Sequence, residues 1–126
     1  MNSKNTENAK RPDIVLDLER LKNNCSNNLA IVTELLNHLH EKSRPKWLKA
    51  LREGIEAGDS ESLREVCHGM KGASATVFAW RISNIALELE CLARDGEVQK
   101  LNERLADLQA AFDELVEWRK KHSELS

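Results

Sequence analysis

The chain has 126 residues, a length typical of one domain with a single core, and 40% of its residues are hydrophobic. Its 19 basic and 21 acidic residues are interspersed and leave a formal net charge of −2, which argues against nucleic-acid binding. No apolar run approaches the roughly 20 residues that a membrane-spanning helix needs, so we expect no membrane segment.

The start of the chain is polar and lacks the apolar centre of a signal peptide. We therefore expect residues 1–12 to form a flexible tail, residues 13–126 to form one domain, and the protein to be cytoplasmic. The three cysteines, Cys25, Cys67 and Cys91, are widely spaced and form no Cys-x-x-Cys pair. They are expected to be core or inert thiols, and neither a disulfide framework nor a metal site is indicated.

Apolar residues recur at steps of three and four, and strand-like alternation is absent, which predicts an all-α protein. A short first helix has an apolar stripe that runs from Ile14 to Leu21. The second predicted helix covers about residues 27–41. The third begins near Ser43, with Pro45 inside its first turn, and ends at Gly58.

Three longer helices complete the predicted fold. The fourth follows Asp59, a residue suited to the N-cap, and covers about residues 60–78. The fifth covers about residues 80–95, and the sixth carries a strict three-and-four stripe from Val98 to Leu115, typical of a bundle seam. Short connections favour antiparallel neighbours, so we expect an antiparallel up-down four-helix bundle with a short extra N-terminal helix.

The fourth helix holds the residue that points to function. At ~100° per residue, His68 lies nearly opposite the centre of the apolar stripe and is expected to face solvent. The residues of that stripe, expected to be buried, are Leu63, Val66, Cys67, Met70, Ala73, Ser74 and Val77.

The neighbours of His68 differ from an ordinary solvated face, because they include Gly69 and Gly72 in mid-helix. Each glycine destabilises the helix by ~1 kcal/mol relative to alanine. A close approach by another protein would explain why such small residues stand next to His68. A neutral imidazole is a competent nucleophile near neutral pH. Arg64 and Lys71 lie within one turn and can pair with phosphoryl oxygens, although an ion pair of Arg64 with a neighbouring glutamate is an equal alternative.

The chain has no Gly-rich phosphate loop and no paired acids to hold Mg²⁺ or ATP. Glu88 and Glu90, at i and i+2, point to different faces and are not expected to form a two-carboxylate catalytic site. A phosphoryl-accepting histidine without this machinery would depend on a partner for catalysis.

The string Cys67-His68-Gly69-Met70-Lys71-Gly72, in which His68 lies nine residues after Asp59, resembles the motif of histidine-containing phosphotransfer (Hpt) domains. The family's later apolar residues and Leu-Glu pair correspond to Ile82, Ile85, Leu89 and Glu90, so the resemblance covers about residues 13–118. It implies that His68 is the phosphoacceptor through Nε2, that Lys71 helps to neutralise the phosphoryl group, and that Gly72 gives clearance for a docking receiver domain. Gly69 and Ala75 are further candidates for this clearance.

One residue departs from the family pattern. Phe78 stands where the family usually has glycine, between the fourth and fifth helices. A phenylalanine adopts positive φ only at a cost, so the turn and the choice of partner are expected to differ there.

The resemblance implies a phosphorelay intermediate rather than an enzyme. A receiver's phospho-aspartate would donate to His68, and a second receiver's aspartate would accept. The implied partners are response-regulator receiver domains and a hybrid sensor histidine kinase. The protein would act as a monomer without a cofactor of its own, with Mg²⁺ only in the receiver. The alternative is an interaction module that sequesters a receiver without transfer, against which the intact motif argues.

Overall fold

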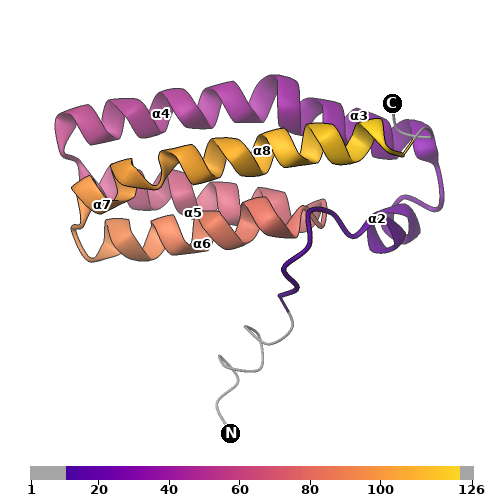
Figure 1. Ribbon diagram of the computed structural model, residues 1–126, viewed down its shortest axis with the longest axis horizontal. Coiled ribbons are helices and arrows are strands. Elements are labelled where there is room, and N and C mark those ends of the chain that lie inside the picture. The colour runs from indigo at the N-terminus through magenta and orange to yellow at the C-terminus, as the bar shows by residue number, and fades with distance from the viewer. Residues whose placement is uncertain (1–10, 123–126) are drawn as a thin grey trace, which may run out of the picture.

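The computed structural model describes residues 11–122, and within them it contains helices and no strand (Figure 1). Four long helical segments lie side by side as an up-down bundle, and short α2 lies at one end, which confirms the predicted fold. The elements in chain order are α2 (Leu18–Asn24), α3 (Leu29–His38), the π-helix η1 (Leu39–Ser43), α4 (Arg44–Ala57), α5 (Ser60–Thr76), α6 (Trp80–Arg94), α7 (Val98–Glu103) and α8 (Leu105–Lys120).

α4 begins at Arg44, next to the start predicted at Ser43, but the first long segment is continuous, so the expected break between two separate helices is absent. Ser43 has helical dihedral angles and makes no side-chain cap, and the backbone N–H of Arg44 bonds to the carbonyl of Leu39, five residues earlier. Pro45 has no N–H and its ring crowds the carbonyl of the preceding turn. The backbone accommodates this proline by widening into one π turn instead of ending the helix.

The π turn changes the direction in which the residues of α3 face relative to those of α4. Because one residue is inserted, about 19 residues rather than ~18 complete five turns, and Leu35 lies on the same side as Gly54. Gly54 faces α5, since a Cβ added there would collide with Leu63. Leu35 and its neighbour Ile31 therefore lie on the α5 side, where they are 39% and 42% exposed.

The predicted sixth helix is divided at Arg104 into α7 and α8, so the expectation of one continuous helix is wrong. The N–H of Arg104 bonds to the carbonyl of Leu101, and its carbonyl accepts from Asp107, which is the tighter three-residue spacing. Its side chain binds Asp107 and Glu88 of α6, which fixes this corner. The apolar stripe survives the break, with Leu101, Leu105, Leu108, Phe112 and Leu115 all buried.

The N-terminal segment before α2 is extended and lies against the start of α6. Ile14, predicted to belong to a helical stripe, is outside any helix and 41% exposed, whereas Leu16 is buried. Arg11 and Pro12, assigned by sequence to a flexible tail, form hydrogen bonds to Asn84. Residues 1–10 lie outside the described residues, so the flexibility predicted for them stays a prediction.

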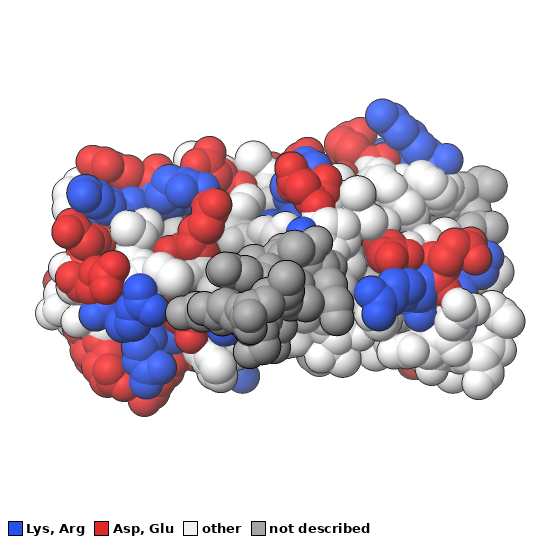
Figure 2. Space-filling view, turned by 90° about the horizontal axis from the view of Figure 1, so that it is seen from below, with Lys and Arg blue, Asp and Glu red and all other residues white. Residues whose placement is uncertain are grey.

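The charged residues do not gather by sign on the face seen in Figure 2, where lysine and arginine lie beside aspartate and glutamate. Ion pairs such as those of Arg81 with Asp13 and Glu114 also bring opposite charges together on the described surface. Among the described residues, no helix is both long and apolar enough to cross a membrane.

Candidate functional site around His68

Helix α5 is positioned by the sharp turn that precedes it. Gly58, at φ 64°, ends α4 in the left-handed conformation, and the side chain of Asp59 accepts a hydrogen bond from the backbone N–H of Ser62. The helix then buries Leu63, Cys67, Met70 and Ser74, as predicted.

The predicted buried stripe of α5 is too wide at one edge. Ala73 is exposed and Val66 is only half-buried. The packed face of α5 is covered by α4 and α6, and residues at the margin of the stripe stay accessible between these contacts. His68 lies on the uncovered face as the helical geometry predicts, and its side chain is 65% exposed.

Glu90 of α6 is the residue that sequence reasoning missed. Its Oε2 lies 2.8 Å from Nδ1 of His68, and its Oε1 accepts a hydrogen bond of 2.6 Å from Nζ of Lys71. The signal in the sequence was the Leu89-Glu90 pair at the family's offset. From the sequence, Glu90 was considered only as a partner of Glu88 in a two-carboxylate site, and Glu88 binds Arg104 instead.

The electrostatics of this cluster keep Glu90 ionised. Partial burial, with the side chain 15% exposed, acts to raise the pKa of Glu90. The hydrogen bonds from Lys71 and His68 and the nearby positive charge outweigh burial, so that the pKa of Glu90 falls below its ordinary value. A carboxylate, which only accepts hydrogen bonds, therefore faces Nδ1.

An ionised partner at Nδ1 has a direct chemical consequence for His68. In the neutral imidazole, the nitrogen that faces a carboxylate carries the hydrogen, and the other nitrogen keeps its lone pair. The geometry thus favours hydrogen at Nδ1 and leaves Nε2 of the exposed ring as the nucleophilic atom. This assignment follows from the hydrogen-bond pattern, since hydrogen positions are inferred from partners.

The two glycines that flank His68 on α5 are not required by packing inside the domain. Gly69 and Gly72 are exposed, and a Cβ added to either would meet no atom within 4 Å. Ala75, the third small residue named from the sequence, is half-buried and its carbonyl accepts from the N–H of Phe78 at the end of the helix. The clearance around His68 therefore lies chiefly at the glycines.

Arg64 carries positive charge on the turn before His68 but uses it in an ion pair. Its Nη2 lies 2.7 Å from Oε1 of Glu61, one of the two partners considered from the sequence. The hydrogen bond to Glu61 and the charge of that carboxylate raise the pKa of Arg64 above its ordinary value.

Cys67 lies next to His68 in sequence and is a poor competing nucleophile. Its side chain is fully buried, and burial together with the charge of Glu90 raises the pKa of the thiol to about 12. The thiolate is the reactive form of cysteine, so Cys67 behaves as a small core residue.

Phe78 adopts the conformation that we expected it to avoid. Its φ is 59°, in the left-handed region, so the turn keeps the shape that a glycine would give. The ring packs edge-on against Trp80, at 6.1 Å between centroids, and the Arg20 guanidinium lies 5.1 Å from it. Its carbonyl accepts from the N–H of Asp17, and these contacts offset the strain.

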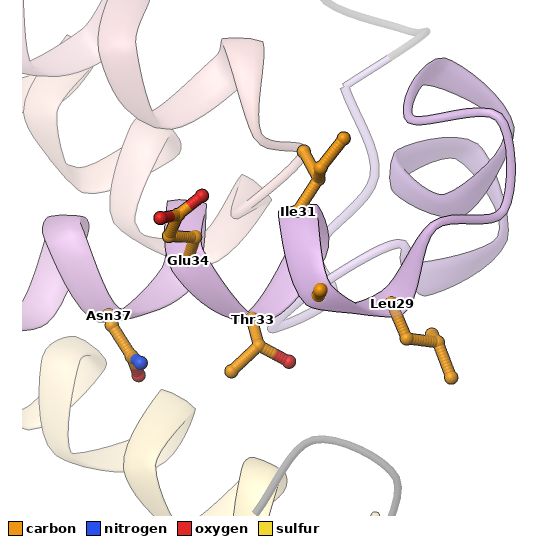
Figure 3. Close-up of a pocket in the computed structure, with 6 residues that line it drawn as sticks. Leu29, Ile31, Thr33, Glu34 and Asn37 are labelled. Carbon is orange, nitrogen blue, oxygen red and sulfur yellow. The ribbon is translucent and has the colours of Figure 1, made fainter.

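One hollow on the surface lies away from His68. It has a volume of about 520 Å³ and runs along α3. Figure 3 shows Ile31 and Glu34 on one side of that helix and Leu29, Thr33 and Asn37 on the other, so the hollow extends around the accessible part of α3 instead of enclosing a ligand. Within residues 11–122, no group of three or more histidine, cysteine, aspartate or glutamate side chains could hold a metal ion.

Comparison with known proteins identifies a family for this chain. The sequence model of the Hpt domain matches residues 13–118. The chain is 33% identical over 75 residues to Sensor protein EvgS of Escherichia coli strain K12, and equally so to Sensor protein EvgS of Escherichia coli O157:H7. In both cases the alignment covers 60% of this chain and 6% of the relative, so the chain spans only a small part of these relatives. No solved structure gives a significant match.

Proposed function

The chain belongs to the Hpt domain family, whose members transfer phosphoryl groups through a histidine in phosphorelays, and from this premise we propose that His68 is the phosphoacceptor. A receiver domain's phospho-aspartate is the donor, and the aspartate of another receiver is the acceptor. The single observation that carries this proposal is the contact of Glu90 with Nδ1, which leaves Nε2 free on an exposed ring.

The transfer step balances without a cofactor in this chain. The lone pair of Nε2 attacks phosphorus, the bond between phosphorus and the aspartyl oxygen breaks, and the aspartate leaves as a carboxylate. The ring gains positive charge while the hydrogen at Nδ1 stays between His68 and Glu90. The ionised Glu90 stabilises that charge, in the way that a carboxylate supports the histidine of a hydrolase triad. Mg²⁺, where transfer requires it, belongs to the receiver.

Lys71 contributes to the same step in two ways. Its hydrogen bond to Oε1 holds the carboxylate of Glu90 so that Oε2 faces the imidazole. Its ammonium group also places positive charge one turn from His68, which helps to neutralise the phosphoryl oxygens. Arg64 adds weaker, longer-range support, because its guanidinium is engaged by Glu61.

The exposed face of α5 is the centre of the docking surface for receivers. Gly69 and Gly72 let a receiver approach the imidazole, and Ile31 with Leu35 forms an apolar rim on the α5 side. Gly54 of α4 lies level with Leu63 of the antiparallel α5. Counted from that level at ~1.5 Å per residue, Leu35 lies about 20 Å along the bundle from His68. An interface of ~800 Å² per partner is about 30 Å across, so one receiver can cover both.

The domain acts as a monomer, because the α5 face must be available to donor and acceptor in turn. It works in the cytoplasm, where reduced thiols persist, which suits the free Cys25, Cys67 and Cys91.

The test is phosphoryl transfer from a ³²P-labelled receiver domain to the full chain. We expect acid-labile label in the wild type and none in His68→Gln. The matched control is His38→Gln, which changes an exposed histidine of α3 instead of α5. We expect this variant to keep the label. Label that persists in His68→Gln, or a wild type that no receiver labels, would rule the proposal out. A receiver that binds tightly without transfer would instead support the sequestering module.

A further inference from the structure

Arg11 lies outside the region that matches the family model, yet hydrogen bonds connect it to the site. Its Nη2 donates to Oγ of Ser83 at 2.6 Å, and that hydroxyl donates to the carbonyl of Lys71 at 2.9 Å. The side chain of Lys71 holds Glu90, which contacts His68. An unbroken series of contacts thus runs from the N-terminal segment to the imidazole.

The guanidinium of Arg11 is held in place from several directions. Its Nε donates to Oδ1 of Asn84 at 3.0 Å, and Nδ2 of the same Asn84 donates to the carbonyl of Pro12 at 3.1 Å. The guanidinium carbon lies 5.5 Å from the ring centre of Trp80. One amide side chain therefore fixes both the backbone and the side chain of this segment.

Arg11 determines what the hydroxyl of Ser83 can do. A serine inside a helix commonly donates to the carbonyl four residues earlier, which here is Ala79. Ser83 is fully buried, and its oxygen accepts from a cation, which polarises the hydroxyl and strengthens its donation to Lys71. Without Arg11, the hydroxyl can rotate back to its own helix.

Helix α6 holds Lys71 at two points. Ser83 and Glu90 are seven residues apart, about two turns, and so lie on the same side of α6. Ser83 bonds the backbone of Lys71 and Glu90 bonds its ammonium group. Together these bonds fix the register of α5 against α6, and this register sets the contact between Glu90 and Nδ1.

We propose that Arg11 is a positioning residue for the His68 site, acting through Ser83 and Lys71. It sharpens the alignment of Glu90 with Nδ1 and so raises the population of the tautomer that leaves Nε2 free. The inference deepens the proposed function and rests on it for its biological role. It also extends the working unit upstream of residue 13.

The experiment measures the ratio of the two neutral tautomers of His68 by long-range ¹H–¹⁵N spectroscopy of the full chain at pH 8. We expect Arg11→Met and Ser83→Ala each to lower the ratio of the tautomer with hydrogen at Nδ1 to the tautomer with hydrogen at Nε2 about threefold, the worth of one hydrogen bond. The double variant should fall no further than either single one, because both break the same series. Arg20→Met, which removes a cation from the Phe78 ring, is the matched control and keeps the wild-type ratio.

Three outcomes would overturn the inference: an unchanged ratio in Ser83→Ala, equal effects of Arg11→Met and Arg20→Met, or additive effects in the double variant. Should Arg11→Met fail to fold, Ser83→Ala decides alone, since it only removes one oxygen. The measurement needs no receiver, so the two proposals fail separately. A changed ratio in a chain that no receiver phosphorylates refutes only the proposed function, and intact transfer with unchanged ratios refutes only this inference.

Discussion

Glu90 of α6 contacts Nδ1 of His68 across 2.8 Å, and so the acid and the exposed imidazole form one unit. Replacement by the isosteric glutamine keeps a side chain that can bond to Lys71 but removes the negative charge. We expect Glu90→Gln to reduce the rate of phosphoryl transfer from a receiver about tenfold, the worth of a charge-assisted hydrogen bond. The rate of ³²P transfer under single-turnover conditions measures this.

Glu88→Gln is the control for that experiment, because Glu88 lies two residues away on the same helix and binds Arg104 instead. Its transfer rate should match the wild type. Equal rates for Glu90→Gln and the wild type would show that the contact with Nδ1 plays no part in transfer.

The depressed pKa of Glu90 also predicts how stability depends on pH. The carboxyl titrates lower in the folded protein than its ordinary value of 4.5, so its ionised form stabilises the fold above that value. This contribution is lost as pH falls through the lower, folded value. Urea unfolding of the wild type and of Glu90→Gln should therefore give a stability difference that is largest near pH 6 and shrinks toward pH 3. A difference that is constant over this range would contradict the assignment.

The helical pattern was sufficient to predict the bundle and the exposed position of His68. Both follow from local periodicity, which places apolar residues such as Leu63 inward and the opposite side of the helix outward. The π turn was not predictable in this way. A cap signal at Ser43 and a proline two residues later indicate a helix start. In the structure the helix continues through both, with Leu39 buried before them and Leu48 and Leu51 buried after them.

Contacts between helices explain the rest of what the sequence left open. Glu90 and His68 are 22 residues apart, and their contact depends on the register of α6 against α5, which periodicity within one helix does not specify. The conformation of Phe78 depends likewise on Trp80 and Arg20, which close around its ring only in the folded protein. The cost of a positive φ for phenylalanine correctly marked Phe78 as unusual. It did not predict which contacts offset that cost.

The positive φ of Phe78 reverses the usual order of alanine and glycine. Both Phe78→Ala and Phe78→Gly lose the ring contacts with Trp80 and Arg20, so both should be less stable than the wild type. Glycine adopts the left-handed region without the penalty of a Cβ, which amounts to about 1 kcal/mol. We therefore expect Phe78→Gly to be more stable than Phe78→Ala by about 1 kcal/mol, measured by urea unfolding. An alanine variant of equal or greater stability would mean that the turn relaxes away from positive φ.

The apolar rim predicted for receiver docking can be separated from the chemistry of His68. Leu35 lies on the α5 side of its helix because of the π turn, and it is as exposed as Ile14, at 39% and 41%. A charge introduced at Leu35 would be desolvated by a docked receiver, so we expect Leu35→Glu to weaken receiver binding about tenfold. Because the residue is exposed, the free energy of unfolding and the tautomers of His68 should stay unchanged.

Ile14→Glu is the matched control for the rim, since Ile14 lies in the extended segment at the start of α6 instead of on the long helix beside α5. Titration calorimetry with one receiver compares the two variants directly. Equal weakening by both would assign the effect to added negative charge alone. Selective weakening by Leu35→Glu would mean that one inserted residue in the helix turns an apolar pair toward the partner.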